Sequence, residues 1–246
     1  MTVIALGALI LVLLLVGTWE YQLHQTVLEK LPNRIHVNGS RGKSSVVRLI
    51  AAGLRAGGFR TLAKVTGTSP RVIDFSGNDR IIHRLRSPSI GEQLRLLRTF
   101  SKENPDYIVI ECMAVMPEYQ WVSEHKMLKS DVSVITNVRM DHVDEMGYTM
   151  EDITRSLANT VPENGKIITT TSPTSNIIKD KSIDNKSEYF EVSGDQIQSD
   201  MMTKFPYLEH NENVALALEV CKQAGVEEKT ALSGMYQSTP DPGALQ

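Results

Sequence analysis

The sequence is poor in cysteine and in aromatic residues. Its two cysteines, Cys112 and Cys221, cannot build a disulfide framework or a metal cluster by themselves, so a reduced, cytosolic setting is expected. Aromatic side chains make up 6% of the 246 residues. This leaves few platforms on which nucleic-acid bases could stack, and we expect no nucleic-acid partner. A hydrophobic content of 41% excludes a disordered, collagen-like or multi-span membrane protein.

Net charge is also small, at −3, but the two signs are separated along the chain. Residues 30–102 contain 15 Lys and Arg against 3 Asp and Glu. Residues 103–246 contain 11 Lys and Arg against 24 Asp and Glu, and we expect the acids after residue 140 to form mostly a solvated surface. The basic half predicts an anionic partner.

Residues 1–21 are expected to anchor the chain in a membrane. Residues 3–17 form an unbroken apolar run, which with its extension to Trp19 approaches the ~17–25 residues that cross a bilayer. Trp19 and Tyr21 suit the membrane interface. No basic residue precedes the run and no small-x-small cleavage site follows it, which disfavours a signal peptide. A buried core helix is the alternative. Because the nearest basic residues follow the run, we expect a single-pass cell-membrane protein with a cytoplasmic catalytic domain.

Beyond Pro32, strand patterns alternate with helix patterns. Strands are expected over residues 34–38, 61–66, 107–112, 132–136 and 166–171, and helices over 44–56, 90–102, 149–160, 211–224 and 227–237. Residues 67–79 are expected to form a loop, and the polar stretch 172–204 to hold one or two short strands around 189–192. Alternation of this kind predicts an α/β domain with a mostly parallel sheet and flanking helices.

The octapeptide N-G-S-R-G-K-S-S at residues 38–45 has the composition of a phosphate-binding loop. It follows an expected strand and opens an expected helix, where glycines let the backbone approach phosphates and the helix N-terminus attracts anions. Lys43 would contact the terminal phosphates, and the Ser44 hydroxyl can bind Mg²⁺. Val37 stands where a full Walker A motif has its first glycine, so this is the short form, G-x-x-G-K-S. A glycine-rich turn without function is the alternative.

Polar residues also stand at two other expected strand ends. Glu111 closes one strand, and Asn137, Asp141 and His142 follow another. Ligands of open α/β sheets bind at the carboxyl ends of strands, and a carboxylate and an imidazole there can hold Mg²⁺ or polarise a substrate. Taken singly, Glu111 could be a salt-bridged acid and His142 a helix cap. Cys112 is expected to pack rather than act as a nucleophile, because no histidine neighbour is evident in the sequence.

Together these motifs resemble the Mur ligase and folylpolyglutamate synthase superfamily. The G-S-R-G-K-S-S loop is similar to the short phosphate loop of that superfamily, and T-N-V-R-M-D-H-V-D at 136–144 to its T-N-x-x-x-D-H-x-D signature. T-S-P-R-V at 68–72, with D-R-I at 79–81, resembles the T-S-P-H-L…E-R-I loop of the folylpolyglutamate branch. H-N-E-N-V-A-L-A-L at 210–218 resembles the helix whose asparagine approaches adenine, with Asn213 as the match and Asn211 as a rival register.

A narrower resemblance is to the ligase subunits of poly-γ-glutamate synthases. It rests on the N-terminal anchor, R-G-K-S, I-G-E-Q, E-C-M-A-V-x-P-x-Y-Q, D-H-x-D-x-M-G and P-D-P-G-A, which cover most of residues 32–243. The resemblance implies an ATP-dependent amide ligase that adds glutamate to capsule poly-γ-glutamate through an acyl phosphate. It implies ATP and Mg²⁺, or Mn²⁺, as cofactors. The implied partners are glutamate, poly-γ-glutamate, and membrane subunits of the PgsC/CapC and PgsA/CapA kinds.

The resemblance also implies roles for individual residues. Catalysis would fall to Lys43, Glu111, Asp141 and His142, with Asp141 orienting His142 or a water molecule. Metal would be held by Ser44, Ser69, Glu111 and His142. ATP would be bound by Asn38, Gly39, Ser40, Arg41, Gly42, Lys43, Ser44, Ser45, Asn137 and Asn213. The basic cluster Arg80, Arg84 and Arg86 would be a track for the acidic polymer, with an ordinary solvated surface as the alternative.

Two departures from the superfamily affect these expectations. Leu157 stands where many Mur-type ligases carry a carbamylated lysine, so the second metal would be held differently. We expect residues 32–239 to form the ATP-binding domain of the Mur ligase kind and residues 240–246 to begin a C-terminal ligase domain that is absent. The chain alone would then bind ATP but ligate poorly. The alternative function is a membrane-anchored ATP-binding or assembly subunit without ligase activity of its own. A kinase or GTPase is a third possibility, but the GTPase form lacks an evident N-K-x-D motif.

Overall fold

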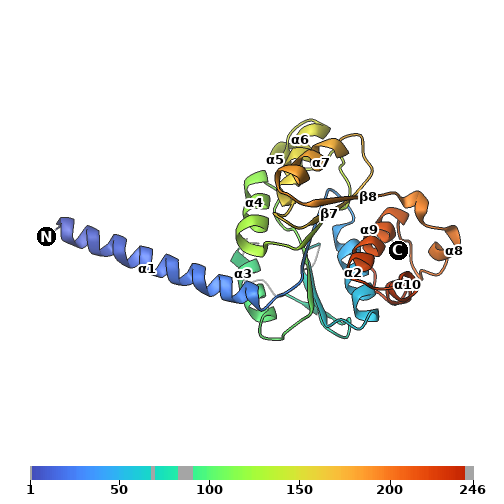
Figure 1. Ribbon diagram of the computed structural model, residues 1–246, viewed down its shortest axis with the longest axis horizontal. Coiled ribbons are helices and arrows are strands. Elements are labelled where there is room, and N and C mark those ends of the chain that lie inside the picture. The colour runs from blue at the N-terminus through green and yellow to red at the C-terminus, as the bar shows by residue number, and fades with distance from the viewer. Residues whose placement is uncertain (1, 68–69, 83–90, 242–246) are drawn as a thin grey trace.

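A single eight-stranded sheet organises the protein. The computed structural model describes residues 2–67, 70–82 and 91–241. The strand order is β4-β3-β2-β5-β1-β6-β7-β8 (Figure 1). The β2–β3 and β3–β4 pairs at one edge are antiparallel, and the other pairs are parallel. The strands are β1 (Arg34–Asn38), β2 (Thr61–Val65), β3 (Arg71–Ile73), β4 (Asp79–Ile81), β5 (Tyr107–Glu111), β6 (Val132–Ile135), β7 (Lys166–Thr170) and β8 (Glu188–Val192).

Helices cover both faces of this sheet. In Figure 1, α2, α9 and α10 pack on one face, and α3 and α4 lie on the other. The α-helices are α1 (Thr2–Glu29), α2 (Lys43–Ala56), α3 (Gly91–Phe100), α4 (Pro117–Val122), α5 (Val143–Met146), α6 (Met150–Leu157), α7 (Ser175–Asp184), α8 (Ser199–Met202), α9 (Asn211–Gln223) and α10 (Glu228–Met235). Because both faces are covered, the central strands are buried along almost their whole length, which explains their continuous apolar sequences.

The predicted α/β architecture and most predicted elements are confirmed. The helix α6 begins as expected, because the Thr149 hydroxyl accepts a hydrogen bond from the backbone N–H of Asp152 at 3.1 Å. The strand expected around residues 189–192 is β8. The same polar stretch also contains α7 and α8, which the sequence did not predict.

The prediction of a loop over residues 67–79 is wrong, because β3 and β4 form a hairpin there. The turn is held by Asp74, whose Oδ1 accepts hydrogen bonds from the backbone N–H groups of Ser76 and Asn78, both at 2.9 Å. Gly77 has a φ of 85° in this turn. Ile73 is buried in the main core, so the hairpin gains stability from packing that local sequence does not show.

Helix α1 is exposed and apolar over most of its length, and its last turns pack against the core of the domain. Among the described residues, one helix is long and apolar enough to cross a membrane, and this helix is α1. It projects away from the sheet (Figure 1). It continues past the expected anchor of residues 1–21. Near its end, Val27 and Leu28 are buried in a cluster with Leu97 and Phe100 of α3. The Nε2 atom of His24 lies 2.7 Å from the Met127 carbonyl oxygen, so the end of α1 is docked on the domain.

Candidate functional site

A cavity of about 410 Å³ opens at the carboxyl ends of β1, β5 and β6. The described residues that line it come from the loop after β1 and the start of α2, from the ends of β5 and β6, from α9 and its preceding loop, and from the end of the described chain. They are Ser40, Arg41, Gly42, Lys43, Ser44, Ser45, Glu111, Asn137, Arg139, Leu208, Glu209, His210, Glu212, Asn213 and Asp241. Most of the residues predicted to bind ATP therefore lie together.

The loop between β1 and α2 requires glycine at two positions. Gly39 has a φ of 131°, and a Cβ there would overlap the side chain of Thr136. Gly42 has a φ of 80°, and a Cβ there would lie 2.8 Å from the Asn213 Oδ1 atom. Gly42 immediately precedes α2 and brings no capping side chain. The first backbone N–H groups of α2 thus face the cavity with the positive potential of a helix N-terminus, which suits an anion.

Contacts with the segment after β6 hold this loop in place. The Ser40 N–H donates to the Asn137 carbonyl oxygen at 3.0 Å, and the Thr136 hydroxyl donates to the Arg41 carbonyl oxygen at 2.6 Å. The Lys43 Nζ atom donates to the Gly39 carbonyl oxygen at 2.7 Å and to the Ser40 carbonyl oxygen at 3.3 Å. The ammonium group of Lys43 is therefore positioned over the loop whose backbone would surround a phosphate.

Glu111 links the phosphate-type loop to the end of β2. Its side chain is buried, and its Oε2 atom accepts hydrogen bonds from the Ser44 hydroxyl at 2.9 Å and from the Thr66 N–H at 2.6 Å. A carboxylate and a hydroxyl at the rim of an anion site are hard oxygen ligands that suit Mg²⁺. Searched over the described residues, the structure contains no cluster of three or more His, Cys, Asp or Glu that could hold a metal ion.

Asp241 is a cavity residue that the sequence did not single out. A Cβ placed on Gly67 would lie 3.2 Å from the Ser44 Oγ atom and 3.4 Å from the Asp241 Oδ2 atom. Gly67 therefore lies close to both the Ser44 hydroxyl and the Asp241 carboxylate. The motif P-D-P-G, which contains Asp241, was visible in the sequence. Its place beside the phosphate-type loop depends on the tertiary fold.

The two candidate asparagines of α9 lie in different places. Asn213 is buried against Gly42 in the cavity, and its Nδ2 atom donates to the Glu209 Oε1 atom at 2.8 Å. Asn211 is exposed, and its Nδ2 atom donates to the Gly194 carbonyl oxygen at 3.3 Å. Asn213 is thus the asparagine placed to contact a ligand in the cavity.

Other predicted site residues lie outside the described lining of the cavity. Asn38 is buried and donates to the Gln120 Oε1 atom at 2.7 Å. The Asp141 Oδ2 atom lies 3.1 Å from the Arg41 Nε atom, and its Oδ1 atom accepts from the His142 N–H at 3.1 Å. His142 is exposed and precedes α5 with a φ of 49°. Its role in binding metal stays a prediction.

The remaining predicted residues are only partly described. Arg80 is exposed, and its Nη2 atom lies 3.1 Å from the Asp74 Oδ2 atom. Leu157 is fully buried in a hydrophobic cluster with Ile153. Three predicted site residues lie outside the described residues. They are the metal ligand Ser69 and the two other arginines of the basic track, Arg84 and Arg86.

A buried ionic cluster joins β1 to the helical segment Ser123–Leu128 that follows α4. The His36 Nδ1 atom, on β1, lies 2.8 Å from the Glu124 Oε2 atom, and both side chains are almost fully buried. Glu124 also accepts hydrogen bonds from the Ser130 N–H at 2.8 Å and the Ser130 hydroxyl at 2.9 Å. Burial alone would lower the pKa of His36, but the Cys112 and Glu124 side chains outweigh burial and raise this pKa to about 10. Cys112 therefore has a histidine neighbour that the sequence did not reveal, although its thiol is buried.

The sheet and its flanking helices define the class: an α/β fold of the kind found in Mur ligases and folylpolyglutamate synthases. The chain belongs to the Mur ligase middle domain family, which matches residues 37–239.

Two curated relatives are similar over almost the whole chain. "Capsule biosynthesis protein CapB" of Bacillus anthracis is 35% identical over 243 residues, which are 98% of this chain and 52% of the relative. "PGA synthase CapB" of Bacillus subtilis (strain 168) is 36% identical over 237 residues, which are 96% of this chain and 60% of the relative. The chain thus spans about half to three fifths of the length of these relatives.

Solved structures support the fold. Escherichia coli FolC in complex with DHPP and ADP superposes with a TM-score of 0.69 at 18% identity, over 92% of this chain and 61% of that one. An FPGS–AMPPCP complex superposes with a TM-score of 0.62 at 17% identity, over 88% of this chain and 67% of that one. A folylpolyglutamate synthase/dihydrofolate synthase with Mn, AMPPNP and L-glutamate bound gives a TM-score of 0.67 at 18% identity, over 92% and 62% of the two chains.

Proposed function

We propose that the chain is the ATP-dependent amide ligase component of a poly-γ-glutamate synthase. The observation that carries the proposal is the cavity in which Lys43, the Ser44–Glu111 pair and Asn213 meet at the N-terminus of α2. The 35–36% identity to two CapB proteins supports poly-γ-glutamate as the product. The fold similarity to nucleotide-bound folylpolyglutamate synthases supports ATP as the energy source.

The residues of the cavity fit ATP and a divalent metal ion. The loop backbone and Lys43 would bind the phosphates, and Asn213 would lie at the adenine end. Ser44 and Glu111 would hold Mg²⁺ or Mn²⁺ together with phosphate oxygens, because both are hard oxygen ligands. The metal would neutralise charge on the phosphates. In this proposal, His142 would bind a metal ion at the edge of the site nearer Arg41, and Asp141 would orient His142 or a water molecule.

The reaction would proceed in two displacements. An oxygen of the acceptor carboxylate attacks the γ-phosphorus of ATP, the bond to ADP breaks, and an acyl phosphate forms. The amine of glutamate then attacks the acyl carbon, releases inorganic phosphate and loses a proton to give the amide. Negative charge spreads over the transferring phosphoryl oxygens, so Lys43 and the N–H groups of α2 would contribute mainly by positioning and by electrostatic stabilisation.

The location and partners of the chain follow from the same proposal. Helix α1 would cross the membrane once and leave the sheet domain in the cytoplasm. The acidic polymer would contact the basic half of the chain, including Arg80. Membrane subunits of the PgsC/CapC and PgsA/CapA kinds would complete the synthase.

The proposal is tested by measuring ADP release by the purified chain in detergent, with Mg·ATP, glutamate and short poly-γ-glutamate. We expect a low rate of ADP release that depends on both glutamate and the polymer. We expect Glu111→Gln to reduce it by about 10²-fold or more, because the amide retains the shape but loses a metal-binding charge. The matched control Glu118→Gln changes an exposed acid of α4 and should leave the rate unchanged. ATP binding without such ADP release would favour the assembly-subunit alternative, and no ATP binding would contradict both.

A second prediction separates the two asparagines of α9. Asn213→Ala should weaken ATP binding about tenfold, because one ligand hydrogen bond is worth ~1–1.5 kcal/mol. Asn211→Ala serves as the matched control and should bind ATP like the unchanged protein. Titration calorimetry with a non-hydrolysable ATP analogue measures both affinities. The reverse pattern would assign the adenine-facing register to Asn211.

A further inference from the structure

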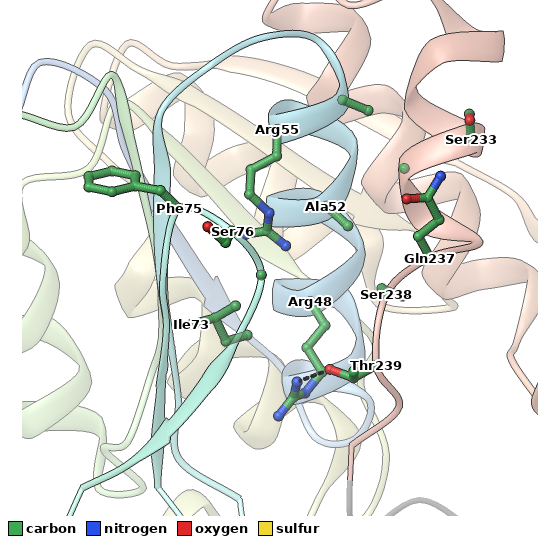
Figure 2. Close-up of a pocket in the computed structure, with 13 residues that line it drawn as sticks. Arg48, Ala52, Arg55, Ile73, Phe75, Ser76, Ser233, Gln237, Ser238 and Thr239 are labelled. Carbon is green, nitrogen blue, oxygen red and sulfur yellow. Dashed lines mark hydrogen bonds between the residues drawn. The ribbon is translucent and has the colours of Figure 1, made fainter.

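A second cavity, of about 360 Å³, lies beside α2 away from the phosphate-type loop. Its walls are α2, the turn of the β3–β4 hairpin, and the C-terminal end of α10 with the residues that follow. Figure 2 shows Arg48 and Arg55 extending from α2 between the hairpin residues and the chain after α10. Arg55 lies twelve residues beyond Lys43 on α2, which is about 18 Å along a helix. This cavity is therefore separate from the proposed ATP site.

The two arginines of this cavity differ in how their charges are balanced. Arg48 donates to both carboxylate oxygens of Asp79, at 2.9 and 2.7 Å, and to the Thr239 hydroxyl at 3.0 Å. Arg55 has no ion pair within the part of the chain that the structure describes, and its Nη1 atom is buried without a hydrogen-bond partner there. Burial lowers the pKa of Arg55, although a guanidinium remains charged in water-accessible protein sites.

Nearby carboxylates do not neutralise Arg55 directly. Asp74 raises the pKa of Arg55 through its charge, but its oxygens accept from the backbone of Ser76 and Asn78 and from the Arg80 side chain. Both oxygens of Asp79 accept hydrogen bonds from Arg48, and its Oδ2 atom also accepts one from Arg71. A half-buried cation whose hydrogen-bond donors are unused carries a desolvation cost that an incoming anion would offset.

The rest of the cavity wall is neutral and rich in hydrogen-bonding groups. Ser76, Ser233, Gln237 and Thr239 line it, and its described lining contains no Asp, Glu or Lys. A Cβ on Gly77 would lie 3.5 Å from the Arg55 Nη2 atom, so the hairpin turn passes close to the guanidinium. One unpaired guanidinium in a cavity lined by hydroxyl and amide groups supplies the kinds of donor that recognise carboxylate or phosphate oxygens.

We propose that the cavity around Arg55 is a binding site for a small oxyanion-bearing molecule, distinct from the nucleotide site. The ligand class is a carboxylate or a phosphate, held by Arg55 and by the neutral donors of the hairpin turn and of α10. The volume exceeds what one phosphate group fills, so the ligand would carry further atoms that contact the apolar side chains of Ala52 and Ile73.

The test uses NMR of arginine side chains in the full chain, titrated separately with sodium phosphate and sodium glutarate at constant ionic strength. The Arg55 Nε–H signal is assigned by its loss in Arg55→Gln. We expect this signal to shift in a saturable manner with at least one of the two anions. A shift with phosphate alone would identify a phosphate ligand, and a shift with glutarate alone a carboxylate ligand. No saturable shift with either anion would overturn the proposal.

Two variants and one control complete the experiment. Ser233→Glu places a carboxylate on the exposed wall of the cavity, where it should compete for Arg55 and weaken anion binding at least tenfold without altering the core. Lys229→Gln removes one positive charge from an exposed position of α10 outside the cavity and should leave the affinity unchanged. Equal weakening in Lys229→Gln and Ser233→Glu would show only a general charge effect and would overturn the site.

Discussion

Lys43→Ala is expected to lower the affinity of the protein for ATP by about 100-fold. Lys43 already donates to the carbonyl oxygens of Gly39 and Ser40, so its ammonium group is positioned where the loop would hold a phosphate. A hydrogen bond to a charged group contributes ~1.5–3 kcal/mol, and the upper part of that range corresponds to this loss of affinity. Titration calorimetry with a non-hydrolysable ATP analogue measures it.

Two controls make the Lys43 result interpretable. Lys102→Ala removes an exposed lysine after α3 and should leave ATP affinity unchanged. Thermal unfolding of Lys43→Ala should resemble that of the unchanged protein, because the side chain makes only hydrogen bonds to its own loop. An unchanged affinity in a folded Lys43→Ala protein would remove this loop from the nucleotide site.

Glu124→Gln is expected to lower the free energy of unfolding by about 3–5 kcal/mol, the usual cost of breaking a buried ion pair. The amide keeps the shape of the side chain but leaves His36 buried without its carboxylate. Chemical denaturation at pH 7 measures the loss. Glu163→Gln is the matched control, since Glu163 is an exposed partner of His125 at 3.6 Å and should contribute under about 1 kcal/mol. Equal losses in the two variants would contradict the assigned role of the buried pair.

The same cluster predicts how stability changes with pH. The pKa of His36 is raised from 6.5 to about 10 in the folded protein. A raised pKa means that the folded state binds the proton more tightly, so the stabilisation is complete below pH 6.5 and is lost as the pH rises toward 10. The free energy of unfolding should therefore fall over this interval. Glu124→Gln should show a shallower fall, because the carboxylate that favours the protonated histidine is absent.

The parts of the site that could be predicted are those encoded by neighbouring residues. The loop with Lys43 and Ser44 is one short motif between a strand and a helix, so composition and spacing suffice to find it. Glu111 could be predicted because the ends of parallel strands meet at one edge of the sheet. Fold class follows for a similar reason, since buried strands and amphipathic helices each have a local pattern.

The parts that were missed depend on contacts between distant segments. Asp241 lines the same cavity as Ser44 and Glu111, although it stands far from both in the sequence. His36 and Cys112 are far apart in sequence, but His36 lies on β1 and Cys112 directly follows the adjacent strand β5. The β3–β4 hairpin was missed because three-residue strands carry too little local pattern, and its stability comes from the burial of Ile73.

The docking of α1 on the domain has a mechanical consequence. The side chains of Val27 and Leu28 belong to the folded core, and β1 begins at Arg34, only a few residues after the helix ends. In a bilayer such a helix would connect the domain to the membrane rigidly. The domain could not rotate freely relative to the helix, because the end of the helix is packed into the domain. The loop that follows β1 would then be held at the far end of that strand, at a constant height above the lipid surface.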